Sequence, residues 1–175
     1  MTKKISNLPD SNHIICKSSY SLNDKSKKNV IPAFAKKIKN IYEITKAGCS
    51  APGIKKTNQD NYFVMDKLMN DPSSYYLGVC DGHGLHGHDV SKFIKDTLPN
   101  EVNIELTRNK DPSKRNYIIE QVFLNVNFKL INDPNIDTTF SGSTCVTVIC
   151  TSESIICANI GDSRAVLGRC IDGGT

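Results

Sequence analysis

Two aspartates stand where side-chain oxygen atoms could bind a hard metal ion. Asp60 ends the hexapeptide KKTNQD, which begins at Lys55, and it directly precedes an apolar run. Asp81 follows the apolar run 75–80 and opens the tetrapeptide DGHG. A carboxylate at the end of a strand stands on a rigid element, and its oxygens suit Mg²⁺ and Mn²⁺. Taken alone, the first segment is more typical of a surface lysine pair with a turn aspartate, and the second is as typical of a turn as of a site.

The neighbours of these aspartates could serve the same chemistry. Either Lys55 or Lys56 can hold a phosphate group as a point charge. Gly82 has no side chain, so its backbone can approach an ion closely. His83 can gain or lose a proton near neutral pH. The two segments could therefore supply metal ligands, a phosphate anchor and an acid or base.

Two further histidines raise the alternative of a zinc site. His86 and His88 lie close to His83 in the sequence. A structural zinc site has four ligands, usually including cysteines, and the sequence contains no C-x-x-C pair. We therefore interpret His86 and His88 as exposed residues of a loop or a helix start.

The cysteines indicate a reducing environment. The sequence has seven, an odd number that does not favour a disulfide framework. Cys80, Cys145 and Cys157 lie within apolar runs, where a free thiol behaves as a small buried hydrophobe. We therefore expect reduced thiols and an intracellular protein, in the cytoplasm or alternatively in the nucleus.

The elements that must position these residues can be read from hydrophobic periodicity. Runs of aromatic and aliphatic residues bounded by turn residues predict strands, and the segment 71–74 predicts a turn. The expected strands cover residues 42–49, 62–65, 75–80, 144–150, 154–160 and 164–167.

Two helices are expected between the early and the late strands. The first has its apolar face at Val90, Phe93, Ile94 and Leu98, and we expect Pro99 to stop it. The second begins after Ser113 as a possible N-cap. Its apolar face comprises Ile119, Val122, Phe123, Val126 and Leu130. Strands, two helices and further strands together suggest a layered α+β fold.

Taken alone, two later segments indicate structural roles rather than chemistry. FSGST, at residues 140–144, leads into a strand. ANIGDSRAVL, at residues 158–167, contains a tight turn across which Asp162 and Arg164 could pair. Neither segment provides a cluster of metal ligands.

The order of all four segments resembles the protein phosphatase 2C (PPM) family of metal-dependent Ser/Thr protein phosphatases. In that family Asn-Gln-Asp or Glu-Asp comes first, followed by Asp-Gly-His-Gly, Ser-Gly-Ser-Thr and Ala-Asn-x-Gly-Asp-Ser-Arg-Ala. The sequence has each in turn, and the likeness covers residues 42–170. The resemblance implies an α+β fold in which a β-sandwich of two antiparallel sheets is flanked by helices, here incomplete at the C-terminus.

The resemblance also implies roles for individual residues. Asp60 and Asp81 match metal ligands of the family, and the residue at the position of Asp81 bridges two ions. Gly82 matches the position that contributes a backbone carbonyl, and His83 matches the proposed general acid for the leaving oxygen.

The implied reaction is the hydrolysis of phosphoserine and phosphothreonine in proteins by water that two Mg²⁺ or Mn²⁺ ions activate. The substrate phosphate would be bound by Lys55 or Lys56, where many family members have Arg. The expected partners are phosphoprotein substrates rather than nucleic acid, and the complete protein is expected to be a monomer.

The distribution of charge divides the chain into two parts. Residues 1–46 hold ten lysines and three acidic residues, a balance of +7, whereas residues 47–175 hold 12 basic and 15 acidic residues, a balance of −3. We expect a disordered Lys-rich leader at residues 1–40 and the N-terminal part of a catalytic domain at residues 41–175. No secretory signal or transmembrane run is visible.

No match to the family's later metal-binding segments is recognised before Thr175. We therefore expect the chain to be inactive by itself, although its parent would be an active phosphatase. Two alternatives stay open at this point: a catalytically inactive phosphatase-like module that binds or regulates partners, and an unrelated α+β binding domain.

Overall fold

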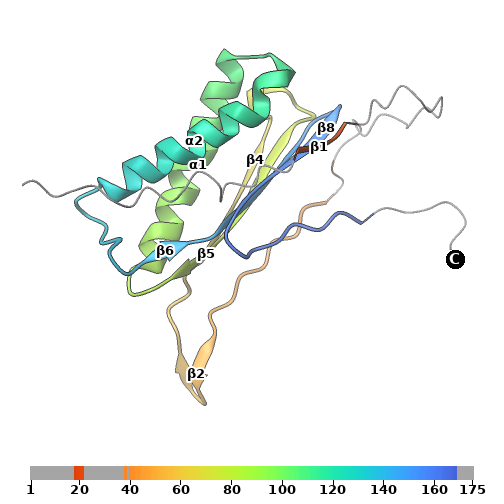
Figure 1. Cartoon of the computed structure of the whole chain (residues 1–175). Helices are drawn as coiled ribbons and strands as arrows, with labels where there is room; N and C mark the ends of the chain where they lie inside the picture. Colours follow the sequence, from red (N-terminus) through yellow and green to blue (C-terminus); the bar gives the residue numbers. More distant parts are fainter. Residues whose placement is uncertain (1–17, 22–37, 39, 169–175) are drawn as a thin grey trace, which may run out of the picture.

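An antiparallel sheet of six strands, covered on one face by two helices, forms the body of the protein (Figure 1). The computed structural model describes residues 18–21, 38 and 40–168. The strand order is β1 (Ser18–Ser21), β8 (Ser154–Ile160), β7 (Cys145–Cys150), β5 (Tyr75–His83) and β4 (Asp60–Asp66), and β6 (Gly142–Ser143) pairs with β5.

The helices are α1 (Gly87–Arg108) and α2 (Arg115–Ile131). A separate two-stranded sheet, β2 (Cys49–Ala51) and β3 (Ile54–Lys55), projects from the body as a hairpin (Figure 1). Short 3₁₀ turns occupy Leu68–Asn70, between β4 and β5, and Pro112–Lys114, between the helices.

The hydrophobic core lies between the sheet and the helices. Side chains alternate along β5, so that Tyr76 and Cys80 are buried in the core while Leu77 and Val79 are more exposed on the opposite face. Full burial of an aliphatic side chain stabilises a fold by about 1.5–3 kcal/mol. The helices contribute buried side chains at helical spacing: Leu98, Val102 and Leu106 from α1, and Ile119, Val122, Phe123 and Val126 from α2.

Helix α1 is longer than its sequence predicts. The expectation that the helix stops at Pro99 is wrong, because Pro99 lies inside α1 and the helix continues to Arg108. A proline ring removes one backbone donor from a helix. Val102 and Leu106 follow in the next turns and are completely buried in the core. Their burial offsets the lost hydrogen bond.

Helix α2 has the predicted apolar face but a different start. Its five predicted apolar positions are all buried. The expectation that Ser113 is the N-cap is wrong, since α2 begins at Arg115 without a side-chain cap. Instead, the carboxylate of Asp111 accepts hydrogen bonds from the backbone N–H and the hydroxyl of Ser113 and caps the preceding 3₁₀ turn.

The structure confirms the strands that have partners. The predictions at 62–65, 75–80, 144–150 and 154–160 correspond to β4, β5, β7 and β8, and the turn at 71–74 is present. The predicted strands at 42–49 and 164–167 are wrong, apart from Cys49 in the hairpin. Tyr42 and Ile44 are 89% and 94% exposed. β-forming residues do not make a strand where no neighbouring strand edge is available.

The expected fold class, antiparallel sheets with flanking helices, is confirmed. Within the described residues the second sheet is the β2–β3 hairpin. Of the expected disordered leader, residues 18–21 form β1, which pairs with β8. Residues 1–17, 22–37, 39 and 169–175 lie outside the described part, so the leader stays a prediction. Among the described helices, none has the length and apolar character needed to cross a membrane.

Candidate active site

Asp60 and Asp81 lie directly opposite each other at one end of the β4–β5 pair. Both side chains are exposed. Partial desolvation raises the pKa of Asp60, and the charge of Asp81 and a hydrogen bond with its carboxyl group raise it further. Apart from this contact between the two carboxyl groups, no N–H or O–H group of the described residues donates a hydrogen bond to either of them. The fold therefore brings two like charges together, and their role as metal ligands stays a prediction.

The backbone beside Asp81 has no room for a side chain. The N–H of Gly82 donates a hydrogen bond to the carbonyl of Gln59, 3.1 Å away, which ties the start of β4 to the end of β5. A Cβ atom at Gly82 would overlap the carbonyl oxygen of Gly87 and lie 2.6 Å from that of Gln59. Only glycine allows three chain segments to meet here.

The loop after β5 depends on a second glycine. Gly84 has a φ of +84°, which side chains rarely adopt, and a Cβ there would overlap the carbonyl oxygen of Phe140. The side-chain amide of Gln59 donates a hydrogen bond to the Gly84 carbonyl at 2.8 Å. The loop is also held by Ser141, whose hydroxyl accepts a hydrogen bond from the His86 N–H at 2.9 Å.

Thr144, which lies between β6 and β7, supports Asp81 from the other side of β5. Its N–H donates to the carbonyl of Asp81 at 2.9 Å, and its hydroxyl accepts from the Asp81 N–H at 3.1 Å. The same hydroxyl lies 2.6 Å from the Ser163 hydroxyl. The segments at residues 140–144 and 158–167 thus contribute Thr144 and Ser163, which support the backbone of Asp81.

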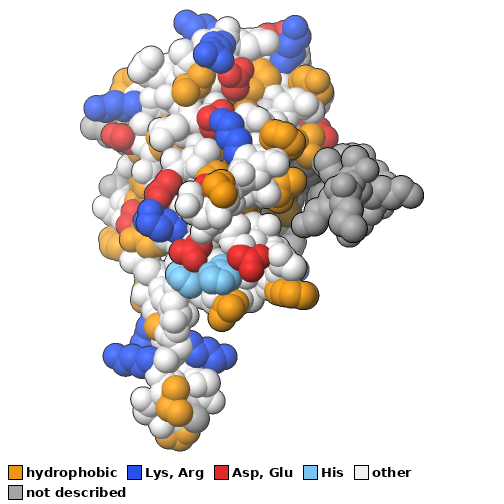
Figure 2. Space-filling model, turned by 90° about the vertical axis from the view of Figure 1, so that its left-hand side faces the viewer, with side chains coloured by type: hydrophobic (Ala, Val, Ile, Leu, Met, Phe, Trp, Pro, Cys, Tyr) orange, Lys and Arg blue, Asp and Glu red, His pale blue; other side chains and the backbone are white. Residues whose placement is uncertain are grey.

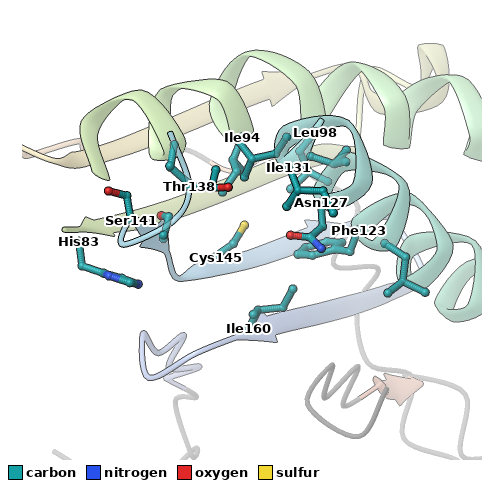
Figure 3. A pocket seen from close by; sticks show the side chains of 16 residues that line it. His83, Ile94, Leu98, Phe123, Asn127, Ile131, Thr138, Ser141, Cys145 and Ile160 are labelled. Atoms are coloured by element: carbon teal, nitrogen blue, oxygen red, sulfur yellow. The ribbon is translucent and has the colours of Figure 1, made fainter. Parts of the chain in front are cut away.

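His83 lies at the mouth of a cavity. It ends β5, pairs with Gly142 and is exposed. A Cβ at Gly142 would lie 2.7 Å from the His83 Nε2 atom, so the imidazole ring lies against this glycine. The cavity, of about 380 Å³, is otherwise mostly apolar and lies between the two helices and strands β7 and β8 (Figure 3).

The lysines lie apart from the two aspartates. Lys55 ends β3 and Lys56 follows it, and both are exposed on the hairpin that protrudes from the body (Figure 2). In the described part of the chain, neither lysine forms an ion pair or side-chain hydrogen bond with Asp60 or Asp81. The structure does not distinguish between Lys55 and Lys56 as a phosphate anchor.

His86 and His88 form a small surface cluster with Asp89. Their ring nitrogens lie 3.5 Å from its carboxylate, and the two rings are stacked 6.5 Å apart. Figure 2 shows histidine side chains next to each other on the surface, beside acidic side chains. The described residues contain no group of three or more His, Cys, Asp or Glu side chains that could hold a metal ion.

Two of the cysteines that we expected to be buried face each other across β5 and β7. Cys80 and Cys145 are free and buried, with their sulfur atoms 3.7 Å apart. The thiol of Cys80 and burial both hold the pKa of Cys145 well above its usual range. Cys157 is free but only partly buried. Asp162 and Arg164 form no ion pair within the part of the chain that the structure describes.

Sequence reasoning missed three supporting residues: Gln59, Ser91 and Thr144. Gln59 and Thr144 lie inside the recognised segments, so their presence there was a usable signal. Ser91 is completely buried, and its hydroxyl donates a hydrogen bond to the Gln59 carbonyl at 2.5 Å. A serine within a helical pattern carries no comparable signal, because most serines of this kind point to solvent.

Comparison with protein families and sequences gives consistent matches. The family model for Protein phosphatase 2C matches residues 44–174. Probable protein phosphatase 2C 35 of Arabidopsis thaliana is 39% identical over 112 residues, which cover 64% of this chain and 31% of that protein. Probable protein phosphatase 2C 64 of Oryza sativa subsp. japonica is 36% identical over 120 residues, with coverages of 66% and 28%. The chain therefore spans less than a third of these curated relatives.

Solved structures also match. A bacterial serine phosphatase is 26% identical with a TM-score of 0.47, over 62% of this chain and 48% of that one. A PPM Ser-Thr phosphatase from Mycobacterium smegmatis, in complex with cacodylate, is 23% identical with a TM-score of 0.43, over 68% and 44% of the two chains.

Proposed function

The chain belongs to the protein phosphatase 2C family, and from this premise we propose that it carries part of the catalytic centre of a metal-dependent protein serine/threonine phosphatase. The observation that carries the proposal is the placement of Asp60 directly opposite Asp81. Two carboxylates held together without a compensating donor favour a site that is completed by a cation.

The residues at this site fit a hard divalent cation. The pKa of Asp60 is raised first by partial desolvation and then by the charge of Asp81, and a bound cation would offset both. Carboxylate oxygens are ligands that Mg²⁺ and Mn²⁺ prefer. We propose Asp60, Asp81 and the carbonyl of Gly82 as ligands, with two ions bound as in the family. Bound ions of this kind supply an activated water molecule and neutralise charge on a phosphoryl group.

The other residues would act on the substrate. His83, exposed at the end of β5, would give a proton to the seryl or threonyl oxygen that leaves. The exposed Lys55 or Lys56 would attract the substrate phosphate. The preferred substrates would then be phosphoproteins, and the protein would work in the cytoplasm or the nucleus.

The proposal can be tested in the protein that carries this chain. Release of phosphate from a phosphothreonyl peptide should require Mn²⁺ or Mg²⁺ and stop when both are chelated. Asp81→Asn should lower turnover at least about 100-fold, because it removes one of the charges that holds the cations. Release of phosphate that persists after complete chelation would contradict the proposal.

A matched control lies on the same strand. Asp66 is an exposed aspartate at the other end of β4, an even number of residues from Asp60. Asp66→Asn removes the same charge from the same face, so turnover should stay within about twofold of the original. Equal losses of turnover for Asp66→Asn and Asp81→Asn would show that the position of the charge does not matter, and would argue against Asp81 as a metal ligand.

A further inference from the structure

Gln59 joins three separate segments of the chain. Its backbone carbonyl accepts hydrogen bonds from the Ser91 hydroxyl of α1 at 2.5 Å and from the Gly82 N–H at 3.1 Å. Its side-chain amide donates to the carbonyl of Gly84 at 2.8 Å. The start of β4, the loop after β5 and the first turns of α1 thus meet at one residue, which immediately precedes Asp60.

The neighbour on the other side of Asp60 is bound to the same helix. The side-chain amide of Asn61 donates a hydrogen bond to the Ser91 hydroxyl at 2.9 Å. Since side chains alternate along a strand, Asp60 is directed away from the helix that holds the residues on either side of it. Ser91, with no exposed surface, therefore binds the backbone carbonyl on one side of Asp60 and the Asn61 side chain on the other.

Gln59 occupies space beside two glycines, with its side-chain amide at Gly87 and its backbone carbonyl at Gly82. A Cβ at Gly87 would lie 2.7 Å from the Gln59 Oε1 atom. A Cβ at Gly82 would lie 2.6 Å from the Gln59 carbonyl oxygen. The amide is therefore in close contact with the loop rather than at its surface, and its position and that of the loop depend on each other.

The contact depends on an N–H donor. The amide nitrogen of Gln59 faces a carbonyl oxygen, which an ionised carboxylate could not bind. The amide group of glutamine therefore makes the bond that ties this residue to the Gly84 carbonyl.

We propose that Gln59 is a positioning residue, which sets the spacing between the carboxylates of Asp60 and Asp81 by tying the start of β4 to the loop of residues 82–87. The inference rests on the proposed function, because the spacing matters only if both carboxylates bind the same cations. It assigns to Gln59 no contact with substrate or metal.

The experiment compares two amide side chains at opposite ends of the β4–β5 pair. Gln59→Leu keeps the approximate size but removes the donor to Gly84. Asn103→Leu is the matched control, because the Asn103 side chain makes a similar bond, from the Met69 N–H at 2.8 Å, at the far end. Gln59→Glu is a second variant that keeps the polarity of the side chain.

Two readouts are measured on each variant. The first is amide hydrogen exchange at residues 82–86, which reports local opening without any metal. Gln59→Leu should accelerate this exchange about tenfold or more, whereas Asn103→Leu should accelerate it only as far as global stability falls. The second is the affinity for Mn²⁺, followed by electron paramagnetic resonance. Loss of a residue that orients metal ligands should lower this affinity about 10–100-fold in Gln59→Leu. Gln59→Glu also lacks the N–H donor to Gly84 and should likewise accelerate the exchange.

The outcomes separate the inference from the proposed function. Unchanged exchange at residues 82–86 in Gln59→Leu would overturn the positioning role, whether or not Mn²⁺ binds. Equal losses of Mn²⁺ affinity in Gln59→Leu and Asn103→Leu would also overturn it, because the effect would then follow global stability. If the unchanged protein does not bind Mn²⁺, the proposed function fails, while the exchange measurement still decides whether Gln59 holds the loop.

Discussion

Both ends of the β4–β5 pair carry aspartates, but the surroundings shift the pKa values of these aspartates in opposite directions. At the far end, the carboxylate of Asp71 accepts hydrogen bonds from the N–H and hydroxyl of Ser73 and from the hydroxyl of Ser74, at 2.9, 2.7 and 2.5 Å. These bonds, above all that from Ser74, lower the pKa of Asp71. At the near end, Asp60 faces Asp81, and its pKa is raised.

The contrast separates a structural aspartate from a candidate ligand. At the far end, Ser73 and Ser74 donate hydrogen bonds to Asp71, and the side chains of Leu68 and Ser74 are completely buried. At the near end, Gly82 and Thr144 hold the backbone, but the two carboxyl groups have no hydrogen-bond partner among the described residues other than each other. A charge that the fold positions but does not satisfy costs stability, and a ligand can recover that cost.

The largest expected effect tests whether the near end is rigid. Gly82→Ala should lower the free energy of unfolding by about 3 kcal/mol, because the new Cβ would overlap backbone atoms that cannot move aside cheaply. Urea denaturation measures the change. Gly48→Ala is the control, since a Cβ at Gly48 meets nothing within 4 Å. If the free energy of unfolding falls by the same small amount in both variants, the three chain segments at Gly82 do not pack as closely as described.

A smaller effect is expected at the far end. Asp71→Asn should lower the free energy of unfolding by about 1–2 kcal/mol at neutral pH, since hydrogen bonds to a charged acceptor are lost. The pKa of Asp71 is lowered in the folded state, so its contribution is present above the unfolded value, about 3.9, and disappears as the pH falls through the folded value. Thermal unfolding followed from pH 7 downward should show the two proteins converging. A constant difference at all pH values would contradict this assignment.

The smallest effect has the opposite sign. Asp60→Asn should raise the free energy of unfolding in metal-free buffer, because it removes a partly desolvated charge and its repulsion from Asp81. The gain should be only about 0.5 kcal/mol, since solvent screens exposed charges. The folded pKa of Asp60 is raised, so the penalty is absent below the unfolded pKa and complete above the folded pKa. Matched urea titrations at pH 7 and at pH 3 should therefore show the gain only at pH 7. Destabilisation at pH 7 would mean that the near end is also structural.

The sequence predicts local features of this fold better than long-range ones. The apolar faces of both helices and four strands follow from periodicity, because burial imposes the pattern on each segment separately. The continuation of α1 past Pro99 depends on the burial of Val102 and Leu106, which the local sequence does not reveal. The exposed run at Tyr42 and Ile44 has strand composition but no partner, and a partner is a long-range property.

The same division holds at the site. Asp60 and Asp81 could be singled out because each stands at the end of an apolar run. That they face each other depends on strand register, and their support depends on hydrogen bonds between residues far apart, as between Gln59 and Gly84. Ser91 is a clear example, since only the folded structure places its hydroxyl between Gln59 and Asn61.

Strands β4 and β5 pair without a register shift from Asp60–Asp81 to Asp66–Tyr75. This pairing limits where the chain can tolerate the insertion or deletion of residues. Deleting one residue from β5 would turn Asp81 toward the helices, and deleting two would restore its face but place it beyond Asp60. The connection at residues 67–74 offers little relief, because Leu68 and Ser74 are buried within it. The tip of the β2–β3 hairpin is different, since a Cβ at Gly53 meets no neighbouring atom. Variation in length among homologous genes should therefore concentrate in the hairpin and spare the segment between the two aspartates.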